Sequence, residues 1–331
     1  MLKVNANMKI AFLVDQENYR RYSPIMPIDW EILQFGNGAV DEEALIATNA
    51  QAILVDPMLS IPGAVLSRMP QLKIVHSFGV GYNQIDVAYA KSAGIYVCNN
   101  AGVNAVAVAE QAILLMLAIL RKYHDGEAMV YTARQGEFKG RCFQNGLIEL
   151  GECSVGLLGM GAIGKEVAKR LHGFGCQVFY FDPYPIQNPE DYHTSLRTKE
   201  EILSQCDIIS LHMPVLPDTI NMICEETIAQ MKPGAVLINT SRGELVDQEA
   251  VCSALKDGRL GGFGADTLSP EPVQPDNPML QLPEEIRSKM ALSPHIGGIT
   301  ASTFYRSYVR AIKNMETALR GERPGNIVNG L

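Results

Sequence analysis

The chain has no run of basic residues, and its 28 Lys and Arg residues are outnumbered by 36 Asp and Glu residues, for a formal net charge of −8. Binding to nucleic acid or to an anionic membrane requires cationic side chains gathered on one surface. The chain also lacks a long hydrophobic run. Its longest apolar stretch, residues 105–120, is interrupted by Glu110 and Gln111 and is too short to span a bilayer. The sequence therefore predicts no nucleic-acid or membrane partner.

The seven cysteines are odd in number and include no Cys-x-x-Cys pair, which favours reduced, intracellular thiols. Lys3 is the one basic residue before the predicted strand at 9–14, and no small-residue cleavage pattern follows it, so the start of the chain does not predict a secretory signal. We expect a cytoplasmic protein. The histidines and cysteines also lack the spacing of a ligand set, so no metal site is predicted. The cysteines are Cys98, Cys142, Cys153, Cys176, Cys206, Cys224 and Cys252.

At 331 residues, the length predicts two domains, and a composition that is 47% hydrophobic and 19% charged predicts folded ones. In the first part, short β-rich runs alternate with helical patterns, which favours a parallel sheet with right-handed crossovers. The predicted strands are residues 9–14, 31–35, 52–55, 73–76 and 95–97, and the predicted helices include 41–48 and 86–93.

A long helix over about residues 104–123 interrupts this alternation and is followed by a polar stretch containing Gly126, Gly136, Gly140 and Gly146. We interpret the helix as the entry to a second domain. There the alternation restarts and predicts a doubly wound nucleotide-binding fold. A closing helix, residues 302–319, has no strand after it and is expected to return to the first domain. The strands of the second domain are predicted at 154–158, 177–181, 207–212, 235–239, 262–265 and 290–292, and its helices at 162–174, 199–204, 225–231 and 248–257.

A glycine-rich turn, Gly159-Met160-Gly161-Ala162-Ile163-Gly164, joins the strand at 154–158 to a helix, where a pyrophosphate binds at the helix N-terminus. The next strand ends at Asp182, whose carboxylate suits the adenosine-ribose hydroxyls and repels a 2′-phosphate. NAD is therefore predicted rather than NADP. A P-loop is disfavoured because Glu166 stands where its Ser or Thr would hold Mg²⁺.

Seven segments in order resemble the D-isomer-specific 2-hydroxyacid dehydrogenases over nearly the whole chain. They are HSFGVGYNQID from His76, NNAGVNAVAVAE from Asn99, VGLLGMGAIG from Val155, HMPVLPDT from His212, INTSRGELVD from Ile238, ADTLSPEP from Ala265 and SPHIGG from Ser293. The resemblance implies an α/β fold of two doubly wound parallel-sheet domains, in which a Rossmann NAD-binding domain (102–298) is inserted into a flavodoxin-like substrate domain (1–101 and 299–331). It also implies a cleft that closes over the substrate and a homodimer built on the 104–123 helix and the segment after it.

The same resemblance implies a catalytic set of Arg242, Glu271 and His295. Reduction of a 2-keto acid delivers hydride to the carbonyl carbon, and a proton must reach the developing alkoxide. The imidazole of His295 suits that task near neutral pH and accepts the proton in the reverse reaction. Glu271 would favour the imidazolium and fix its orientation. The planar fork of Arg242 matches the substrate carboxylate.

The resemblance also assigns binding residues. Backbone N–H groups of Val80 and Gly81, together with Arg242 and His295, are expected to bind the substrate. Asp266 matches an acid near the nicotinamide, with a structural role as the alternative. The expected cofactor-binding residues are Gly159, Gly161, Ala162, Ile163, Gly164, Asp182, Pro214, Thr219, Thr240, Ser241, Asp266, His295 and Gly297.

Several alternatives stay open. Pro294 stands where formate dehydrogenases have Gln, and Val80 stands where phosphite dehydrogenase has Lys, so both activities are disfavoured. Phosphoglycerate dehydrogenases often add a C-terminal regulatory domain, but some lack it, so a phosphorylated substrate remains an alternative. Residues 300–303 lack the acid usual after the PHIGG segment. A further alternative is an NAD-sensing corepressor or scaffold of the same fold, which would not require an intact Arg, Glu and His set.

Overall fold

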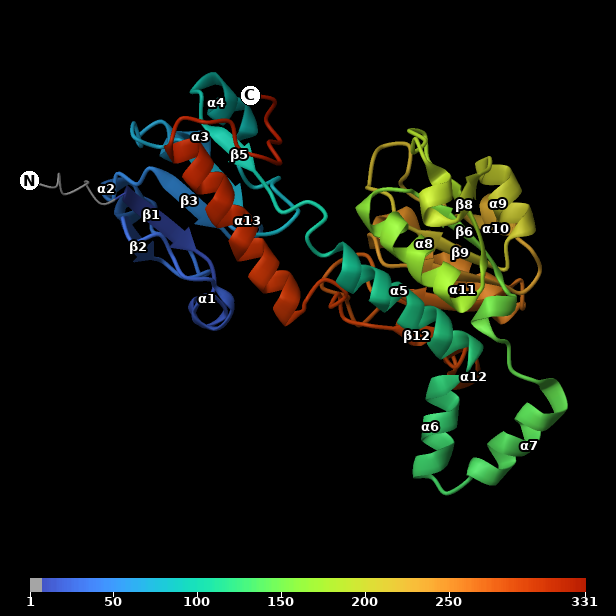
Figure 1. Ribbon diagram of the computed structural model, residues 1–331. Helices are drawn as coiled ribbons and strands as arrows, with labels where there is room; N and C mark the ends of the chain where they lie inside the picture. The colour runs from blue at the N-terminus through green and yellow to red at the C-terminus, as the bar shows by residue number, and fades with distance from the viewer. Residues whose placement is uncertain (1–7) are drawn as a thin grey trace, which may run out of the picture. The chain divides into compact units, whose positions relative to one another are not determined.

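The computed structural model describes residues 8–331, and Figure 1 traces the chain. Residues 1–7, half of the stretch inspected for a secretory signal, lie outside the described residues. Contacts divide the chain into two compact units, residues up to Asn104 together with Ile299–Leu331, and Ala105–Gly298. The sequence predicts the first junction after residue 101, and the chain passes into the second unit after Asn104.

The first unit contains a five-stranded sheet in which every strand pair is parallel and the order is β2-β1-β3-β4-β5. This is the flavodoxin-like order. β3 and β4 are buried along their whole length, as expected when helices cover both faces of a parallel sheet. The strands are β1 (Met8–Leu13), β2 (Trp30–Gln34), β3 (Ala52–Val55), β4 (Ile74–Ser77) and β5 (Tyr96–Cys98).

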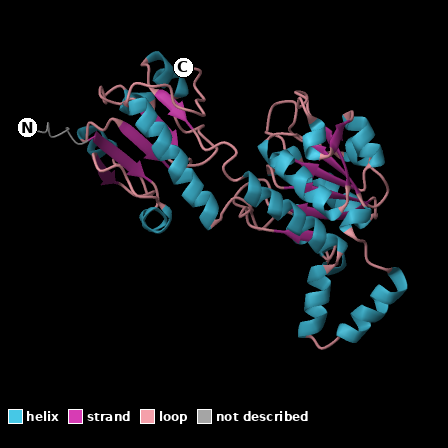
Figure 2. Cartoon of the chain, in the orientation of Figure 1, coloured by secondary structure: helices cyan, strands magenta, loops and turns pink. Residues whose placement is uncertain are grey.

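Helices pack on both faces of this sheet (Figure 2), and alternate residues of β1 face opposite cores. Ala11 and Leu13 share one core with the short helices after β2, β3 and β4, whereas Ile10 and Phe12 share the other with α13 (Ala301–Leu319). The closing helix therefore returns to the first unit, as predicted. The remaining helices of this unit are α1 (Gln16–Tyr22), α2 (Glu42–Ala47), α3 (Gly63–Leu66) and α4 (Val87–Ser92).

The second unit contains a seven-stranded parallel sheet ordered β12-β11-β10-β9-β6-β7-β8. Counted from β6, this is the Rossmann order 3-2-1-4-5-6 with one strand added, and the order reverses between β6 and β9. The predicted fold class is confirmed. The strands are β6 (Ser154–Leu158), β7 (Gln177–Phe181), β8 (Thr194–Leu196), β9 (Ile208–Leu211), β10 (Ala235–Asn239), β11 (Leu260–Ala265) and β12 (Met290–Leu292).

The long helix α5 (Ala105–Leu120) packs closely against the second sheet because β11 carries glycines beneath it. A Cβ at Gly262 would lie 2.4 Å from the Ile119 side chain, and one at Gly264 would lie 3.0 Å from Cβ of Leu115. Any larger residue at either position would push the helix outward. The other helices around this sheet are α8 (Ala162–Phe174), α9 (Lys199–Gln205), α10 (Glu225–Gln230), α11 (Gln248–Lys256) and α12 (Glu284–Arg287).

The segment after α5 differs from the prediction. The helix expected over 104–123 ends at Leu120, and the glycine-bearing stretch after it forms two helices, α6 (Tyr123–Tyr131) and α7 (Gln135–Asn145). Glycine disfavours helix, but Gly126 lies where α6 meets α7, and a Cβ there would be 3.2 Å from the Phe138 ring. Neither helix buries a side chain, and Figure 1 shows the two together away from the sheet.

Among the described residues, no helix combines the length and the apolar character needed to cross a bilayer.

Candidate active site

The glycine-rich turn has the close packing expected of a dinucleotide site. Gly159, at φ 104°, approaches the carbonyl of His212 so closely that a Cβ would lie 2.3 Å from its oxygen. A Cβ on Gly164 would lie 2.4 Å from the carbonyl oxygen of Gly159. A Cβ added to Gly161 would have no atom within 4 Å, and Gly161 supplies no side-chain cap to α8. Two glycines thus serve packing, and the third leaves the N-terminus of α8 open.

Asp182 follows β7 and lies against this turn. One carboxylate oxygen accepts the backbone N–H of Met160 at 2.8 Å, and the other accepts that of Tyr184 at 2.8 Å. Each carboxylate oxygen has more than one lone pair, so both can accept a further hydrogen bond. The position and the remaining acceptor capacity fit the hydroxyls of a ribose.

Polar atoms without partners mark the carboxyl ends of the central strands. His212 Nδ1 after β9, Thr240 Oγ1 after β10 and Thr267 Oγ1 after β11 are buried and have no hydrogen-bond partner among the described residues. Burial lowers the pKa of His212 to about 4, so its imidazole is neutral. Buried polar groups normally find partners, so this edge suits a polar ligand. Together with the turn, these residues fit a bound dinucleotide.

Other predicted cofactor residues border the same edge. Thr219 Oγ1 donates to the carbonyl of Pro214 at 2.9 Å and so closes the loop after β9. Ser241 Oγ donates to the carbonyl of Leu211 at 2.8 Å, which ties the end of β10 to β9. Ala162 and Ile163 are the first two residues of α8.

Arg242 extends from the loop after β10. Its Nη1 donates to the carbonyl of Ser241 at 2.7 Å, and its own carbonyl accepts from Asn239 Nδ2 at 2.8 Å. The next residue, Gly243, is pressed against the backbone of the loop that carries Glu271, because a Cβ there would lie 2.4 Å from Ser269 N. The side chain itself is exposed, which leaves the rest of its planar fork accessible to a ligand.

The structure brings Glu271 and His295 together. Glu271 Oε1 lies 2.5 Å from His295 Nδ1, and the two side chains are 46% and 41% exposed. An imidazole that donates through Nδ1 to a carboxylate directs Nε2 away from it. A histidine paired with a carboxylate in an accessible position has the chemistry that proton transfer requires, and here the two residues lie 24 positions apart in the sequence.

Asp266 holds the loop that carries His295. Its buried carboxylate accepts the Ser293 hydroxyl at 2.5 Å and the backbone N–H groups of Ile296 and Gly297 at 3.0 and 2.8 Å. Its carbonyl accepts the N–H of His295 at 2.8 Å. His295 itself adopts φ 55°, a left-handed conformation that costs energy in a residue other than glycine. These hydrogen bonds favour the structural role of Asp266, while its place near the nicotinamide stays a prediction.

Val80 and Gly81 belong to the first unit, in the loop after β4. The carbonyls of this loop are engaged by buried side chains. Asn100 Nδ2 donates to Phe78 at 2.7 Å, Asn99 Nδ2 to Val80 at 2.7 Å, and Ser77 Oγ to Gly81 at 2.5 Å. Within residues 8–331, the N–H groups of Val80 and Gly81 have no acceptor. An anion is the natural ligand of such donors.

Sequence reasoning missed the supporting amides. Gln111 Nε2 donates to Ser293 Oγ at 2.8 Å, so α5 reaches the Asp266 cluster. Gln111 is noted above only as one of two polar residues that interrupt an apolar stretch, although a partly buried polar residue in such a helix also indicates a specific partner. No comparable signal marks Gln248 and Asn277, which contact the loop that carries Glu271. Among the described residues, no three metal-ligating side chains cluster.

A Rossmann sheet with an open glycine turn, and an accessible histidine–carboxylate pair in the same unit, define a dinucleotide-dependent oxidoreductase. The family model for the D-isomer specific 2-hydroxyacid dehydrogenase NAD binding domain matches residues 113–297. The chain belongs to the D-isomer-specific 2-hydroxyacid dehydrogenases, a family of NAD-dependent oxidoreductases acting on CH–OH donors.

Individual relatives agree with this assignment. The chain is 36% identical over 284 residues to the glyoxylate reductase of Korarchaeum cryptofilum, covering 84% of this chain and 81% of that one. It is 33% identical over 294 residues to the glyoxylate reductase of Thermofilum pendens, covering 87% and 82%. The D-lactate dehydrogenase of Lactobacillus jensenii with NAD⁺ superposes with a TM-score of 0.80 at 25% identity, covering 97% and 99%.

Proposed function

We propose that this protein reduces a small 2-keto acid to a D-2-hydroxy acid with NADH, reversibly, and that His295 donates the proton. The observation that carries the proposal is the 2.5 Å contact between His295 Nδ1 and Glu271 Oε1. It supports a histidine with a fixed orientation and one nitrogen free to face a substrate.

When bound, NADH supplies the hydride that reaches the carbonyl carbon. Glu271 accepts the Nδ1–H of the imidazolium, and this leaves the proton on Nε2 to move to the carbonyl oxygen as negative charge develops there. After the transfer, the imidazole is neutral and retains its hydrogen bond to Glu271. In the oxidation direction, Nε2 accepts the hydroxyl proton instead.

Arg242 binds the substrate carboxylate in this scheme. Its exposed guanidinium offers parallel N–H donors to two carboxylate oxygens, and a charge-assisted pair of this kind is stronger than neutral hydrogen bonds. We also assign substrate binding to the N–H groups of Val80 and Gly81, because the carbonyls of their loop are already occupied and, within residues 8–331, these donors are not.

For the cofactor, we propose that Asp182 accepts the ribose hydroxyls and that Gly161, Ala162 and Ile163 receive the pyrophosphate at the start of α8. The carboxylate of Asp182 disfavours the extra phosphate of NADPH. We also assign Pro214, Thr219, Thr240, Ser241, Asp266, His295 and Gly297 to the cofactor site.

Among substrates, glyoxylate and hydroxypyruvate come first, since relatives of 36% and 31% identity are named glyoxylate reductase and hydroxypyruvate reductase. The test is an NADH-oxidation screen with glyoxylate, pyruvate, hydroxypyruvate, longer 2-keto acids and phosphohydroxypyruvate, and with phosphite and NAD⁺ in the reverse assay. Turnover of a small keto acid that is lost in His295→Ala supports the proposal. Tight NAD binding without turnover of any compound would support the NAD-sensing alternative.

We also propose a homodimer formed through α5, α6 and α7. Tyr131 and Phe143 are more than 80% exposed on helices that bury no side chain, and such surfaces commonly pack against a partner. Sedimentation as a monomer at micromolar concentration would contradict the dimer. The free state of all seven cysteines supports a reducing, cytoplasmic location, which fractionation of the native host would test.

A further inference from the structure

We propose that Gln248 and Asn277 are positioning residues for Glu271. Their side-chain amides hold the backbone of the loop that presents Glu271 to His295. The inference rests on the proposed function, in which the Glu271 carboxylate orients the proton donor.

The loop that carries Glu271 has little support of its own. Residues 270–276 are all exposed, and within the described chain no backbone N–H from Thr267 to Asp276 donates to a backbone carbonyl. Among residues 8–331, the Glu271 side chain has one hydrogen bond, the contact with His295. The position of Glu271 therefore depends on whatever fixes the ends of the loop.

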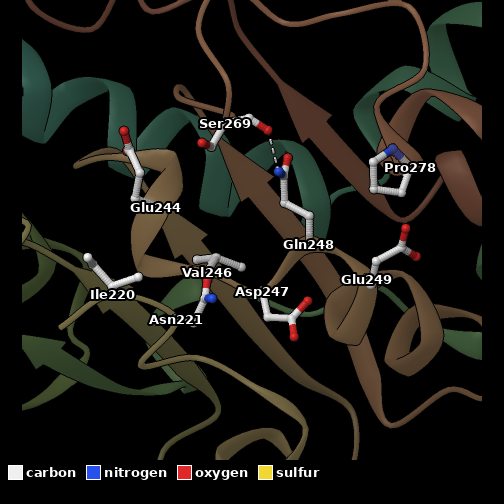
Figure 3. Close-up of a pocket in the computed structure, with 9 residues that line it drawn as sticks. All are labelled: Ile220, Asn221, Glu244, Val246, Asp247, Gln248, Glu249, Ser269 and Pro278. Carbon is white, nitrogen blue, oxygen red and sulfur yellow. Dashed lines mark hydrogen bonds between the residues drawn. The ribbon is translucent and has the colours of Figure 1, made fainter. Parts of the chain in front are cut away.

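Two amides converge on the carbonyl of Ser269, two residues before Glu271. Gln248 Nε2 donates to it at 2.5 Å, as the dashed line in Figure 3 shows, and Asn277 Nδ2 donates to it at 3.2 Å. Asn277 Nδ2 also donates to Gln248 Oε1 at 3.0 Å, so the three groups form one network. A carbonyl oxygen has two lone pairs and can accept both donors.

Both amides come from well-anchored positions. Gln248 is the first residue of α11, whose N-cap Asp247 accepts the N–H of Ala250. Asn277 is buried, and its Oδ1 accepts the N–H of Met279 at 3.0 Å. Gly243 lies on the other side of Ser269, so close that a Cβ on Gly243 would be 2.4 Å from Ser269 N. The Ser269 backbone is therefore held on two sides.

The network borders an acidic cavity that the predicted catalytic residues do not line. Gln248 and Ser269 line a cavity of about 450 Å³ together with the carboxylates of Glu244, Asp247 and Glu249 (Figure 3). Arg242, Glu271 and His295 do not line it. In this acidic setting, a carboxylate at position 248 would have no proton to donate, whereas the amide of Gln248 supplies the donor that the Ser269 carbonyl requires.

The first experiment replaces Gln248 by Met, which keeps the length of the side chain and removes both donor and acceptor. We expect kcat to fall about 10-fold or more, because small displacements of catalytic groups have large effects on rate. The Kd for NADH is expected to stay within about 2-fold. The matched control is Gln230→Met, since Gln230 is exposed on α10 and its side-chain amide donates to the carbonyl of Glu226, one turn away on the same helix. Asn277→Ala, the second variant, is expected to act in the same direction as Gln248→Met.

A double-mutant cycle separates positioning from general loss of stability. If Gln248 acts through Glu271, then Gln248→Met in a Glu271→Gln background is expected to lower kcat less than about 2-fold further. The same fractional loss in both backgrounds would overturn the proposal, as would normal kcat in both Gln248→Met and Asn277→Ala.

A crystal structure of Gln248→Met keeps the test independent of turnover. We expect the distance between Glu271 Oε1 and His295 Nδ1 to exceed hydrogen-bonding range. A contact still at 2.5 Å would overturn the positioning role. Failure of the wild-type protein to reduce any keto acid would instead count against the proposed function, while the crystallographic comparison still decides whether Gln248 positions Glu271.

Discussion

The carboxylate of Asp266 accepts the backbone N–H of Gly297 at 2.8 Å, and a Cβ on Gly297 would lie 2.8 Å from that same oxygen. The two residues thus fit only because one of them lacks a side chain. Since Asp266 also bonds Ser293 and Ile296, it sets the path of the backbone on both sides of His295.

Asp266→Asn is expected to destabilise the protein. The asparagine side chain has one acceptor oxygen where the carboxylate has two. Its NH₂ group would face at least one of the donors from Ser293, Ile296 and Gly297 that now bond the carboxylate. Leaving a buried donor unpaired costs about 1 to 3 kcal/mol, so we expect a lower Tm together with a lower kcat. Differential scanning calorimetry and NADH kinetics would measure both. Asp191→Asn, at an exposed position, is the control, and an equal Tm in the two variants would contradict the role of Asp266.

His295→Ala is expected to lower kcat by about 10² to 10⁴-fold, the usual contribution of a general acid. Fluorescence titration should show that NADH binding is kept, because the change removes a proton donor and not the glycine-rich turn. Near-normal turnover would refute the acid role of His295.

Arg242→Ala should raise KM for the keto acid and also lower kcat. Charge-assisted hydrogen bonds contribute about 1.5 to 3 kcal/mol, so an increase in KM of roughly 10-fold or more is expected. Arg242→Lys should recover little, because a single ammonium cannot reproduce the planar fork. Steady-state kinetics would decide, with Arg287→Ala on α12 as the exposed control. An effect on Tm alone would indicate a structural role.

Asp182→Ala should weaken NADH binding about 10-fold and reduce the preference for NADH over NADPH. The reason is the loss of an acceptor for the ribose hydroxyls and of the charge that repels a 2′-phosphate. The ratio of kcat/KM for the two cofactors is the measurement. An unchanged ratio would remove Asp182 from the ribose site.

Acid should destabilise the first unit through His76. Burial lowers the pKa of His76 to about 4, and the neutral ring is satisfied by the Ser77 carbonyl at Nδ1 and by Asn314 Nδ2 at Nε2. Because the folded pKa lies below the unfolded value near 6.5, the unfolded state binds the proton first. Stability is therefore fully present above pH 6.5 and falls between pH 6.5 and 4, by at most about 3 kcal/mol.

Calorimetry of His76→Gln would check this, since the variant should lose part of the pH dependence of Tm in that window. The control is His124→Gln, whose side chain is exposed on α6. Equal pH dependence in wild type and His76→Gln would show that another group is responsible.

The sequence predicted the sheet of the second unit well because its strands are short apolar runs bounded by turns. Residues 154–158, 177–181 and 235–239 are strands with the predicted bounds. Buried parallel strands produce such runs directly. By contrast, β8 (Thr194–Leu196) is an edge strand with one exposed residue and no apolar run, so no local pattern marked it.

Local apolar pattern failed for helices that bury no side chain and for contacts between residues far apart in the sequence. α6 and α7 form despite their glycines, and α1 is a seven-residue helix without a buried residue. Similarly, the motifs identified Glu271 and His295, but the amides that support them bond across long separations. Gln111 and Ser293 are 182 residues apart, and Gln248 and Ser269 are 21 apart. Pairings of this kind depend on the assembled fold and not on spacing along the chain.

Gly262 and Gly264, two of the three glycines of β11, link the interior of the sheet to the loop that carries His295. Because these two positions lack side chains, α5 packs close enough to the sheet for Gln111 to donate to Ser293. Ser293 in turn donates to Asp266, which holds the loop that carries His295. Replacing Gly262 or Gly264 by a β-branched residue would improve strand propensity. It would also push α5 outward and move the Gln111 amide away from Ser293. We expect a substitution that strengthens the strand in this way to weaken the proposed proton transfer from a distance.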